Sequence, residues 1–252
     1  WKWTQGGDLI NVLGEDHKLQ AKQVGMTLEE LGEKRPEVVF YSFIKLPEGK
    51  MSTRRGNVVF MDDLLEEAKE QAAVVVRELR PHYDEDKISA IAEAVGTSAV
   101  RFNIIKVSPE KGFTFRWEDA LTFEAGSAPF IMYSHTRACS IRKRVQNEVG
   151  PIEDILNGDI ETKEHFSDGL ITLLRGLAVH QDRVEKAVND HRPHLFAEHM
   201  LHLANAYNAF YRDCHILTDG HVDGFYLWVS ELARGIMKDG MEGLGLVAIE
   251  EM

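Results

Sequence analysis

A chain of 252 residues is long enough for one large domain or for two domains of ordinary size. Its 44% hydrophobic and 28% charged residues are typical of a globular protein, and no apolar run predicts a membrane span. The formal net charge of -12 excludes a protein that coats nucleic acid through a broad basic face. It leaves room for a few basic side chains that bind one discrete RNA.

The first residue and the cysteines bear on whether the chain is a fragment and on the cellular compartment in which it occurs. Trp1 stands where a full-length protein would begin with Met, and neither the basic nor the apolar region of a signal peptide follows it. We therefore expect a fragment without a signal peptide. Cys139 and Cys214 lie outside any C-x-x-C spacing, which argues against a disulfide framework and favours a reducing cytoplasm.

The first 45 residues predict a strand, a helix and a second strand. Residues 9–14 and 38–44 are apolar runs of strand length, and the segment between them favours a helix from His17 to Leu31, closed by Gly32. This order is typical of a doubly wound nucleotide-binding sheet, which binds ligands at the carboxyl ends of its strands. The turn after the first strand is therefore a candidate site.

Helices are predicted after this α/β segment. Asp62 or Asp63 is expected to cap a helix that runs to about Arg80, where a proline follows. Gly96 is expected to divide the next helical stretch, residues 87–106, into a pair of shorter helices.

Residues 113–117 alternate like an exposed-edge strand or an extended connector, the linker between the two parts is expected near residues 112–117, and the chain beyond it has a helical pattern. Apolar side chains recur at helical spacing in residues 170–177, 196–210 and 225–236, and a long helix is predicted over residues 127–149. These helices predict an antiparallel bundle.

The most specific local pattern is the run KMSTRRGNVV at residues 50–59. It combines three cations in six positions with two hydroxyl groups and a glycine, directly after the α/β segment. Such a loop suits a polyphosphate, because the cations neutralise phosphate charge and the glycine lets the backbone approach. A solvated basic hairpin tip is the alternative that composition leaves open.

This run resembles the KMSKS loop of class I aminoacyl-tRNA synthetases, in the form typical of arginyl-tRNA synthetases. The resemblance implies that Lys50 stabilises the transition state of amino-acid adenylation, and that Ser52 and Arg54 support the phosphates of ATP. It implies that Met51 anchors the loop beside the ATP site.

The sequence Gly14-Glu15-Asp16-His17 resembles the Gly-x-Asp-His stretch at which these synthetases hold the adenosine of ATP. The resemblance implies that Gly14, Asp16 and His17 bind ATP, with Asp16 accepting from a ribose hydroxyl. A strand-to-helix turn with Asp16 as the helix cap explains these residues equally well.

Residues 124–137 resemble the helix that opens the anticodon-binding domain of arginyl-tRNA synthetases, with Pro129 in its first turn. The basic residues on this helix are expected to face tRNA phosphates, although a solvated helix face would explain each of them as well. They are Arg137, Arg142, Lys143 and Arg144.

A second match to this domain covers residues 193–195, 203–211 and the hydrophobic tail 244–252. Most of its apolar residues are expected to be core. The residues expected to contact anticodon bases are Asn208, Tyr211 and Met252.

Four histidines close together in sequence invite a metal interpretation. His191, His194, His199 and His202 surround Glu198, but their order does not match H-E-x-x-H. A polar helix face is the better interpretation, and no metal site is predicted.

The sequence thus predicts an α/β plus all-α protein. Residues 1–117 would form the C-terminal end of a Rossmann-type class I synthetase catalytic domain with its connecting helices, and residues 118–252 an α-helical anticodon-binding bundle. The HIGH motif and the arginine-binding segment are absent, so the fragment is expected to be inactive alone.

The resemblance implies an arginine-tRNA ligase that uses ATP, Mg²⁺, arginine and tRNA(Arg), acts as a monomer in the cytoplasm and binds no membrane. Two alternatives remain open: a noncatalytic tRNA-binding paralogue and another class I synthetase. Intact Lys50, Ser52 and Arg54 count against the first, and the arginyl-like helical stretch from Gly126 to Arg137 counts against the second.

Overall fold

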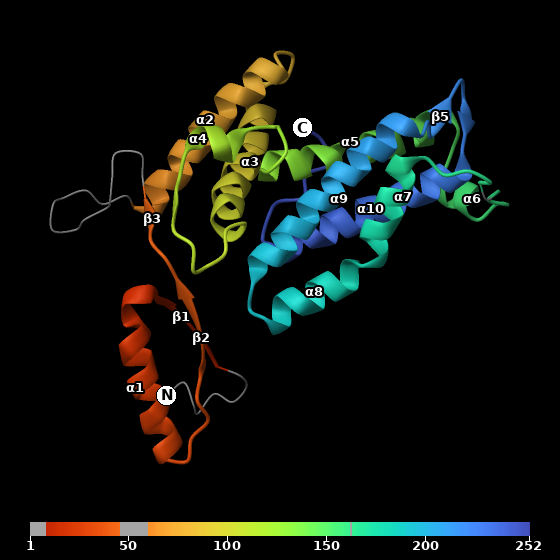
Figure 1. Cartoon of the computed structure of the whole chain (residues 1–252). Coiled ribbons are helices and arrows are strands. Elements are labelled where there is room, and N and C mark those ends of the chain that lie inside the picture. The colour runs from red at the N-terminus through yellow and green to blue at the C-terminus, as the bar shows by residue number, and fades with distance from the viewer. Residues whose placement is uncertain (1–8, 46–59, 162) are drawn as a thin grey trace.

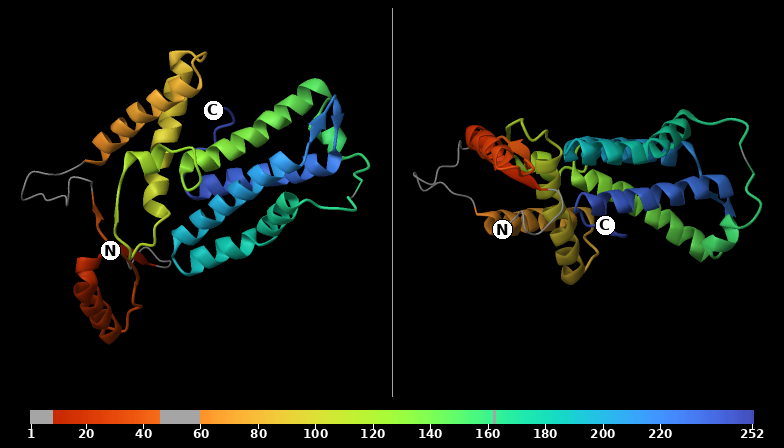
Figure 2. Two further views of the ribbon diagram at one scale, coloured as in Figure 1. Left: turned by 45° about the horizontal axis from the view of Figure 1, so that its top comes forward. Right: turned by 90° about the horizontal axis from the view of Figure 1, so that it is seen from below.

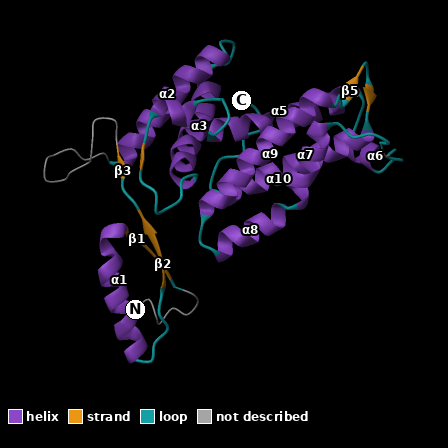
Figure 3. Ribbon diagram, viewed as in Figure 1, coloured by secondary structure: helices purple, strands orange, loops and turns teal. Residues whose placement is uncertain are grey.

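The structure is a computed structural model that describes residues 9–45, 60–161 and 163–252 (Figure 1). An α/β unit at the N-terminal end is joined through a largely helical connection to a bundle of long helices, and the few strands lie in the α/β unit, in the connection and at the far end of the bundle (Figure 3). Both predicted parts of the fold, α/β and all-α, are present.

The α/β unit has the predicted strand, helix and strand. Strand β1 spans Ile10–Gly14 and strand β2 spans Glu37–Tyr41, and the two pair in parallel. The short 3-10 helix η2 at Glu15–His17 and helix α1 at Lys18–Glu30 connect them. Gly32, with a φ of 78°, ends the helix in the left-handed conformation that glycine tolerates best.

Three helices and a second pair of strands make the connection. The strands β3, Ile44–Lys45, and β4, Phe113–Thr114, pair in parallel, so the strand alternative is confirmed for residues 113–114. The helices are α2 at Met61–Leu79, α3 at Glu85–Ile105 and α4 at Trp117–Leu121.

The predicted break at Gly96 is wrong, because α3 is one continuous helix. A Cβ atom on Gly96 would lie 2.7 Å from the carbonyl oxygen of Ala68 and 2.9 Å from the backbone nitrogen of Lys69. The glycine is needed where α2 and α3 cross closely, and the packing offsets its low helix propensity.

The predicted cap of α2 is also wrong. Phe60 occupies the N-cap position without a side-chain hydrogen bond, and Asp62 and Asp63 lie inside the first turn. There they favour the helix through the positive end of its dipole. The predicted end of the helix near Arg80 is confirmed.

The bundle confirms the helices predicted from their apolar spacing. Its long helices lie side by side in both views of Figure 2, which show α9 beside α7 and α5. Its elements are α5 (Ala128–Glu148), α6 (Ile152–Leu156), α7 (Asp168–Ala178), α8 (His180–Asn189), α9 (Pro193–Asp213), β5 (Leu217–Thr218), β6 (His221–Val222) and α10 (Gly224–Gly243).

The start of α5 follows the sequence rules closely. Ser127 is the N-cap, its hydroxyl accepts from the backbone nitrogen of Phe130 at 3.2 Å, and Pro129 lies in the first turn as predicted. Gly169 brings α7 against α9, since a Cβ there would lie 2.9 Å from the backbone carbonyl carbon of Ala209.

Helix α3 is long and apolar enough to cross a membrane by length and composition, which the sequence analysis did not expect. In this fold 61% of its most apolar window is buried against neighbouring helices. We interpret α3 as a core helix.

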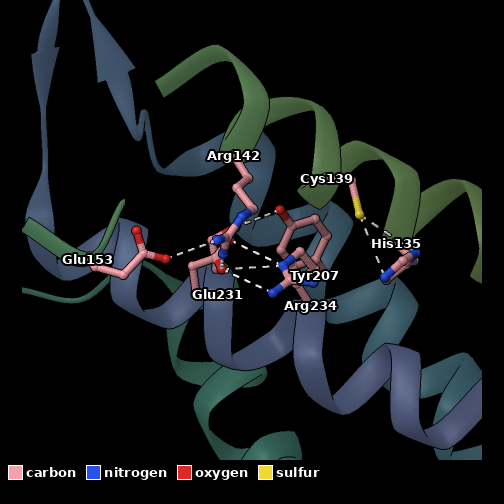
Figure 4. Close-up of polar contacts among 8 residues, drawn as sticks. His135, Cys139, Arg142, Glu153, Tyr207, Glu231 and Arg234 are labelled. Atoms are coloured by element: carbon pink, nitrogen blue, oxygen red, sulfur yellow. Dashed lines mark hydrogen bonds and ion pairs between the residues drawn. The ribbon is translucent and has the colours of Figure 1, made fainter. Parts of the chain in front are cut away.

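Both cysteines are unpaired and buried inside the bundle. The Sγ atom of Cys139 lies 3.6 Å from Nε2 of His135 (Figure 4), and that of Cys214 lies 3.3 Å from the hydroxyl of Ser167. Burial raises the pKa of both thiols.

Candidate nucleic-acid interface

Arg137 is held between two tyrosine rings on the surface of the bundle. Its guanidinium lies 4.8 Å from the ring centre of Tyr133 and 4.8 Å from that of Tyr211. It also donates to the Tyr133 hydroxyl at 3.1 Å. Tyr133 precedes Arg137 by one turn of α5, whereas Tyr211 comes from α9. Cation–π contacts with both rings fix the guanidinium in place.

Asn208 also contacts the side chain of Arg137 and helps to orient it. Its side-chain oxygen accepts from Arg137, and its Nδ2 donates to the hydroxyl of Ser134 at 2.8 Å. That hydroxyl in turn donates to the carbonyl of Phe130 at 2.9 Å. Both ends of the Asn208 amide are engaged, so this residue positions Arg137, and only the second N–H and the second lone pair of the amide are left for the predicted base contact.

Arg137 stands in a cleft of about 590 Å³, which we call the tyrosine–arginine cleft. It brings together five of the seven residues predicted to bind tRNA: Arg137, Lys143, Arg144, Tyr211 and Met252. The other residues that line it are Arg80, Tyr83, Tyr133, Thr136, Ser140, Asn147, Glu148, Glu250 and Glu251.

The basic residues of the tyrosine–arginine cleft differ in whether they form an ion pair within the protein. Nε of Arg144 donates to Oε1 of Glu148 at 2.7 Å, and this hydrogen bond raises the pKa of Arg144. Lys143 is exposed and forms no ion pair with any residue that the structure describes. Both cations can meet a phosphate group, because their side chains are at the surface.

Arg142 has a different place from the other basic residues of α5. Its guanidinium forms ion pairs with Glu231, which also accepts from Arg234, and with Glu153 at 3.3 Å (Figure 4). The side chains of Arg142 and Glu231 are only 27% and 11% exposed. This geometry gives Arg142 a role inside the bundle and speaks against the predicted phosphate contact.

The C-terminal tail is fixed by hydrogen bonds to α3 and α5. The backbone nitrogen of Val247 donates to the hydroxyl of Ser98 at 3.0 Å, and Nδ1 of His135 donates to the carbonyl of Ile249 at 2.9 Å. Burial lowers the pKa of His135, which keeps this imidazole neutral.

The last residues of the tail form one wall of the tyrosine–arginine cleft. Glu251 accepts from Lys87 at 2.6 Å and from the Tyr83 hydroxyl at 2.9 Å, and Arg80 donates to the carbonyl oxygen of Met252 at 3.0 Å. The Met252 side chain is buried, and it also borders a smaller cavity of about 210 Å³ that Phe123 helps to line.

Two further residues of the cleft, Arg80 and Tyr83, were not predicted from the sequence, and they lie at and just after the end of α2. No local pattern distinguishes them from ordinary helix-end residues. Only the packing of α3 against α5, together with the hydrogen bonds of Arg80 and Tyr83 to the tail, brings them to the cleft.

The residues predicted to bind ATP lie at the carboxyl end of β1, as expected for a parallel sheet. Gly14 is buried, and a Cβ there would lie 2.5 Å from Oδ1 of Asp16, so the glycine makes room for that carboxylate. Nε2 of His17 lies 3.8 Å from Oδ2 of Asp16, and both side chains are more than half exposed. The hydroxyl of Ser42, just past β2, donates to Glu15 at 3.0 Å.

The predicted loop residues Lys50, Met51, Ser52 and Arg54 lie outside the described residues. The histidine group is divided: His191 pairs with Glu37, whereas His199 contacts His180 at 3.1 Å and lines another pocket together with His202 and Glu198. Within residues 9–45, 60–161 and 163–252, no three side chains suited to a metal ion come together.

Comparisons with known proteins place both parts of the chain. Residues 21–117 match the family described as tRNA synthetases class I (R), catalytic domain, and residues 131–252 match the DALR anticodon binding domain. The chain is 38% identical over its full length to the arginine–tRNA ligase of Methanococcoides burtonii and 41% identical to that of Methanocella arvoryzae.

The chain spans 44% and 43% of the length of these two curated relatives. The solved structure of Thermus thermophilus arginyl-tRNA synthetase is similar to this fold with a TM-score of 0.81 and 25% sequence identity. That similarity covers 97% of this chain and 41% of the Thermus chain.

A class I catalytic segment followed by an anticodon-binding helical domain defines a class I aminoacyl-tRNA synthetase. The two curated relatives that match the whole chain, at 38% and 41% identity, are both arginine–tRNA ligases. The chain belongs to the arginyl-tRNA synthetase family.

Proposed function

We propose that the chain is part of an arginine-tRNA ligase. The intact enzyme would join the carboxylate of arginine to the α-phosphate of ATP, release pyrophosphate, and transfer the arginyl group to the terminal ribose of tRNA(Arg). The observation that carries the proposal is the union, in one chain, of a class I catalytic segment with the tyrosine–arginine cleft of an anticodon-binding domain.

An exposed apolar sheet supports the proposal that the chain is part of a longer protein. Parallel sheets are normally covered on both faces, yet Ile10 and Val12 of β1 are 48% and 65% exposed. They border an apolar cavity of about 830 Å³ that reaches α8 and α9. Additional strands and helices of a catalytic domain would bury this surface.

In the ATP site, Asp16 would accept from a ribose hydroxyl and His17 would lie beside the adenosine, while Lys50, Ser52 and Arg54 would hold the phosphates. Mg²⁺ prefers oxygen ligands, and the carboxylates of Glu15 and Asp16 at the end of β1 are donors of that kind. Bound Mg²⁺ would neutralise charge on the phosphates of ATP.

In the tRNA site, Arg137 is the central group. Two of its guanidinium nitrogens are committed to Asn208 and Tyr133, which leaves its remaining N–H groups for a phosphate or a base edge. The exposed ring of Tyr211 offers a surface for unstacked anticodon bases, and the largely buried Met252 borders the same cleft.

The 252-residue chain alone is expected to form no arginyl-adenylate. Cations that stabilise departing pyrophosphate cannot act when the rest of the substrate site is missing. Arginine-dependent exchange of pyrophosphate into ATP measures this, with the intact enzyme as the positive control. Exchange by the chain alone would show that the site is complete without additional residues.

Lys143→Ala and Arg144→Ala are each expected to weaken the binding of all tRNAs alike. Each substitution should lower the slope of log affinity against log salt concentration by about 0.7 to 0.9, because each removes one phosphate contact. Filter binding at several salt concentrations measures the slope, and Arg212→Ala, an exposed arginine on α9 outside the cleft, is the control.

Tyr211→Ala or removal of the last few residues should instead weaken the binding of arginine tRNAs preferentially. The salt slope should stay nearly unchanged, because contacts to bases rather than contacts to phosphates would be lost. If both variants keep the preference for arginine tRNA, the tail and Tyr211 serve only packing.

Two other functions give different results in the intact protein. A noncatalytic tRNA-binding paralogue would bind tRNA without any exchange of pyrophosphate into ATP. Another class I synthetase would show exchange with a different amino acid. We further propose that the enzyme acts in the cytoplasm as a monomer, and the two free buried thiols support a reducing compartment.

A further inference from the structure

A second polar pocket, of about 360 Å³, lies between α7, α8 and α9, and we call it the α7–α9 pocket. Three of its residues can carry positive charge: Arg175 from α7, Arg183 from α8 and His202 from α9. One carboxylate, that of Glu198, stands on its rim. Apolar groups such as Leu195 and Ala206 complete the lining.

The two arginines of this pocket are unusual in having no hydrogen-bond or ion-pair partner among the residues that the structure describes. Nearly all arginines that the structure describes donate to a carboxylate, an amide or a carbonyl group. Among these described residues only Arg116, Arg175 and Arg183 form no such contact, and two of the three meet in one pocket. In a chain with a net charge of -12, carboxylates are abundant, yet no carboxylate of the described residues pairs with Arg175 or Arg183.

A pair of histidines lies behind the two arginines. His199 is 6% exposed, lines the pocket, and its Nε2 lies 3.1 Å from Nδ1 of His180. Burial first, and then the nearby His180 and Arg183, lower the pKa of His199 to about 4. A neutral imidazole here keeps one polar hydrogen and adds no charge, so the arginines supply the positive field.

The α7–α9 pocket is separate from the tyrosine–arginine cleft. Both use α9, but Ala206 lines the pocket whereas Asn208 reaches Arg137 of α5. Two residues turn a helix by about 200°, so the two sites face opposite sides of α9. A nucleotide bound in the cleft cannot fill the pocket as well.

We infer that the α7–α9 pocket binds a phosphate group, either of an RNA backbone or of a small phosphorylated molecule. Two guanidinium groups with free N–H forks match the oxygens of a phosphate, and a third donor is available from His202. The carboxylate of Glu198 on the rim would repel an anion there and confine the phosphate to the arginine side.

Inorganic phosphate tests the site directly with the 252-residue chain. Saturable shifts of the His199 and His202 imidazole resonances are expected in NMR titrations, beyond those that chloride causes at the same ionic strength. Replacing Arg175 and Arg183 together by Ala should weaken phosphate binding at least about tenfold, because two charge-assisted hydrogen bonds are lost.

Arg116→Ala is the matched control, since Arg116 is the remaining unpaired arginine of the described residues and lies outside the pocket. It should leave phosphate binding unchanged. The inference is overturned if phosphate causes no saturable shift beyond chloride, or if Arg116→Ala weakens binding as much as the double variant.

A tRNA(Arg) transcript distinguishes the two sources of phosphate. If the double variant lowers the salt slope of tRNA binding by about 1.4 to 1.8, the pocket holds two RNA phosphate contacts. If the slope is unchanged while inorganic phosphate still binds the unaltered chain, the pocket serves a small phosphorylated molecule. Neither result depends on the catalytic activity of the intact enzyme.

Discussion

Lys50→Ala in the intact enzyme is expected to lower kcat for arginine adenylation about 100-fold, with a smaller effect on the affinity for arginine. The Lys50 ammonium would contact the phosphates most strongly as negative charge develops on departing pyrophosphate, so its loss raises the barrier more than it weakens binding of the ground state. Pre-steady-state formation of arginyl-adenylate measures the effect.

Lys45→Ala is the matched control for this experiment. Lys45 is an exposed lysine at the end of β3, a few residues before the KMSTRRGNVV run. It should leave kcat unchanged. Equal rates for the Lys50 variant and the unaltered enzyme would make the loop a bystander and would favour the solvated hairpin.

Glu231→Gln is expected to lower the free energy of unfolding by about 3 kcal/mol. It removes the negative charge shared by Arg142 and Arg234, whose side chains are only 27% and 21% exposed, and leaves two partly buried guanidinium groups without their main counter-charge. Urea denaturation of the 252-residue chain measures the change.

Glu153→Gln provides the comparison, because Glu153 contacts the same Arg142 from a position that is 68% exposed. Exposed ion pairs contribute little to the free energy of unfolding, so Glu153→Gln is expected to lower it by less than about 1 kcal/mol. Equal losses for the two variants would mean that burial does not distinguish the two pairs and that Arg142 is free to bind elsewhere.

The helical part of the fold could be predicted because its signals are local. Apolar side chains at helical spacing mark α7, α9 and α10, and the Ser127 cap with Pro129 fixes the start of α5. The continuity of α3 through Gly96 could not be predicted, since the reason for the glycine is the backbone of α2, which only the packed structure brings there.

The basic residues of α5 show what helical geometry adds to a motif. Arg144 follows Arg137 by seven residues, about two turns, and lines the same cleft. Arg142 follows Arg137 by five residues and is turned about 140° away, toward Glu231. The spacing alone could have separated the two, whereas the partner of Arg142 could not be read from the sequence.

The role of Asn208 in the candidate site could not be predicted from the sequence. The sequence places a polar residue at the edge of an apolar helix face, which suits a base contact and a structural contact equally. Its use in orienting Arg137 depends on Ser134 and on the crossing of α5 over α9. The cleft residues Arg80 and Tyr83 depend in the same way on tertiary packing.

The reactivity of the two buried thiols can be used to measure local opening of the bundle. Cys139 lies in the middle of α5, and Cys214 follows the end of α9, so an alkylating reagent reaches each one only when its own region opens. Their raised pKa values slow the reaction further in the folded state, since the thiolate is the reactive form. Alkylation followed by mass spectrometry would therefore report separately how often α5 and the far end of α9 come apart, with and without bound tRNA.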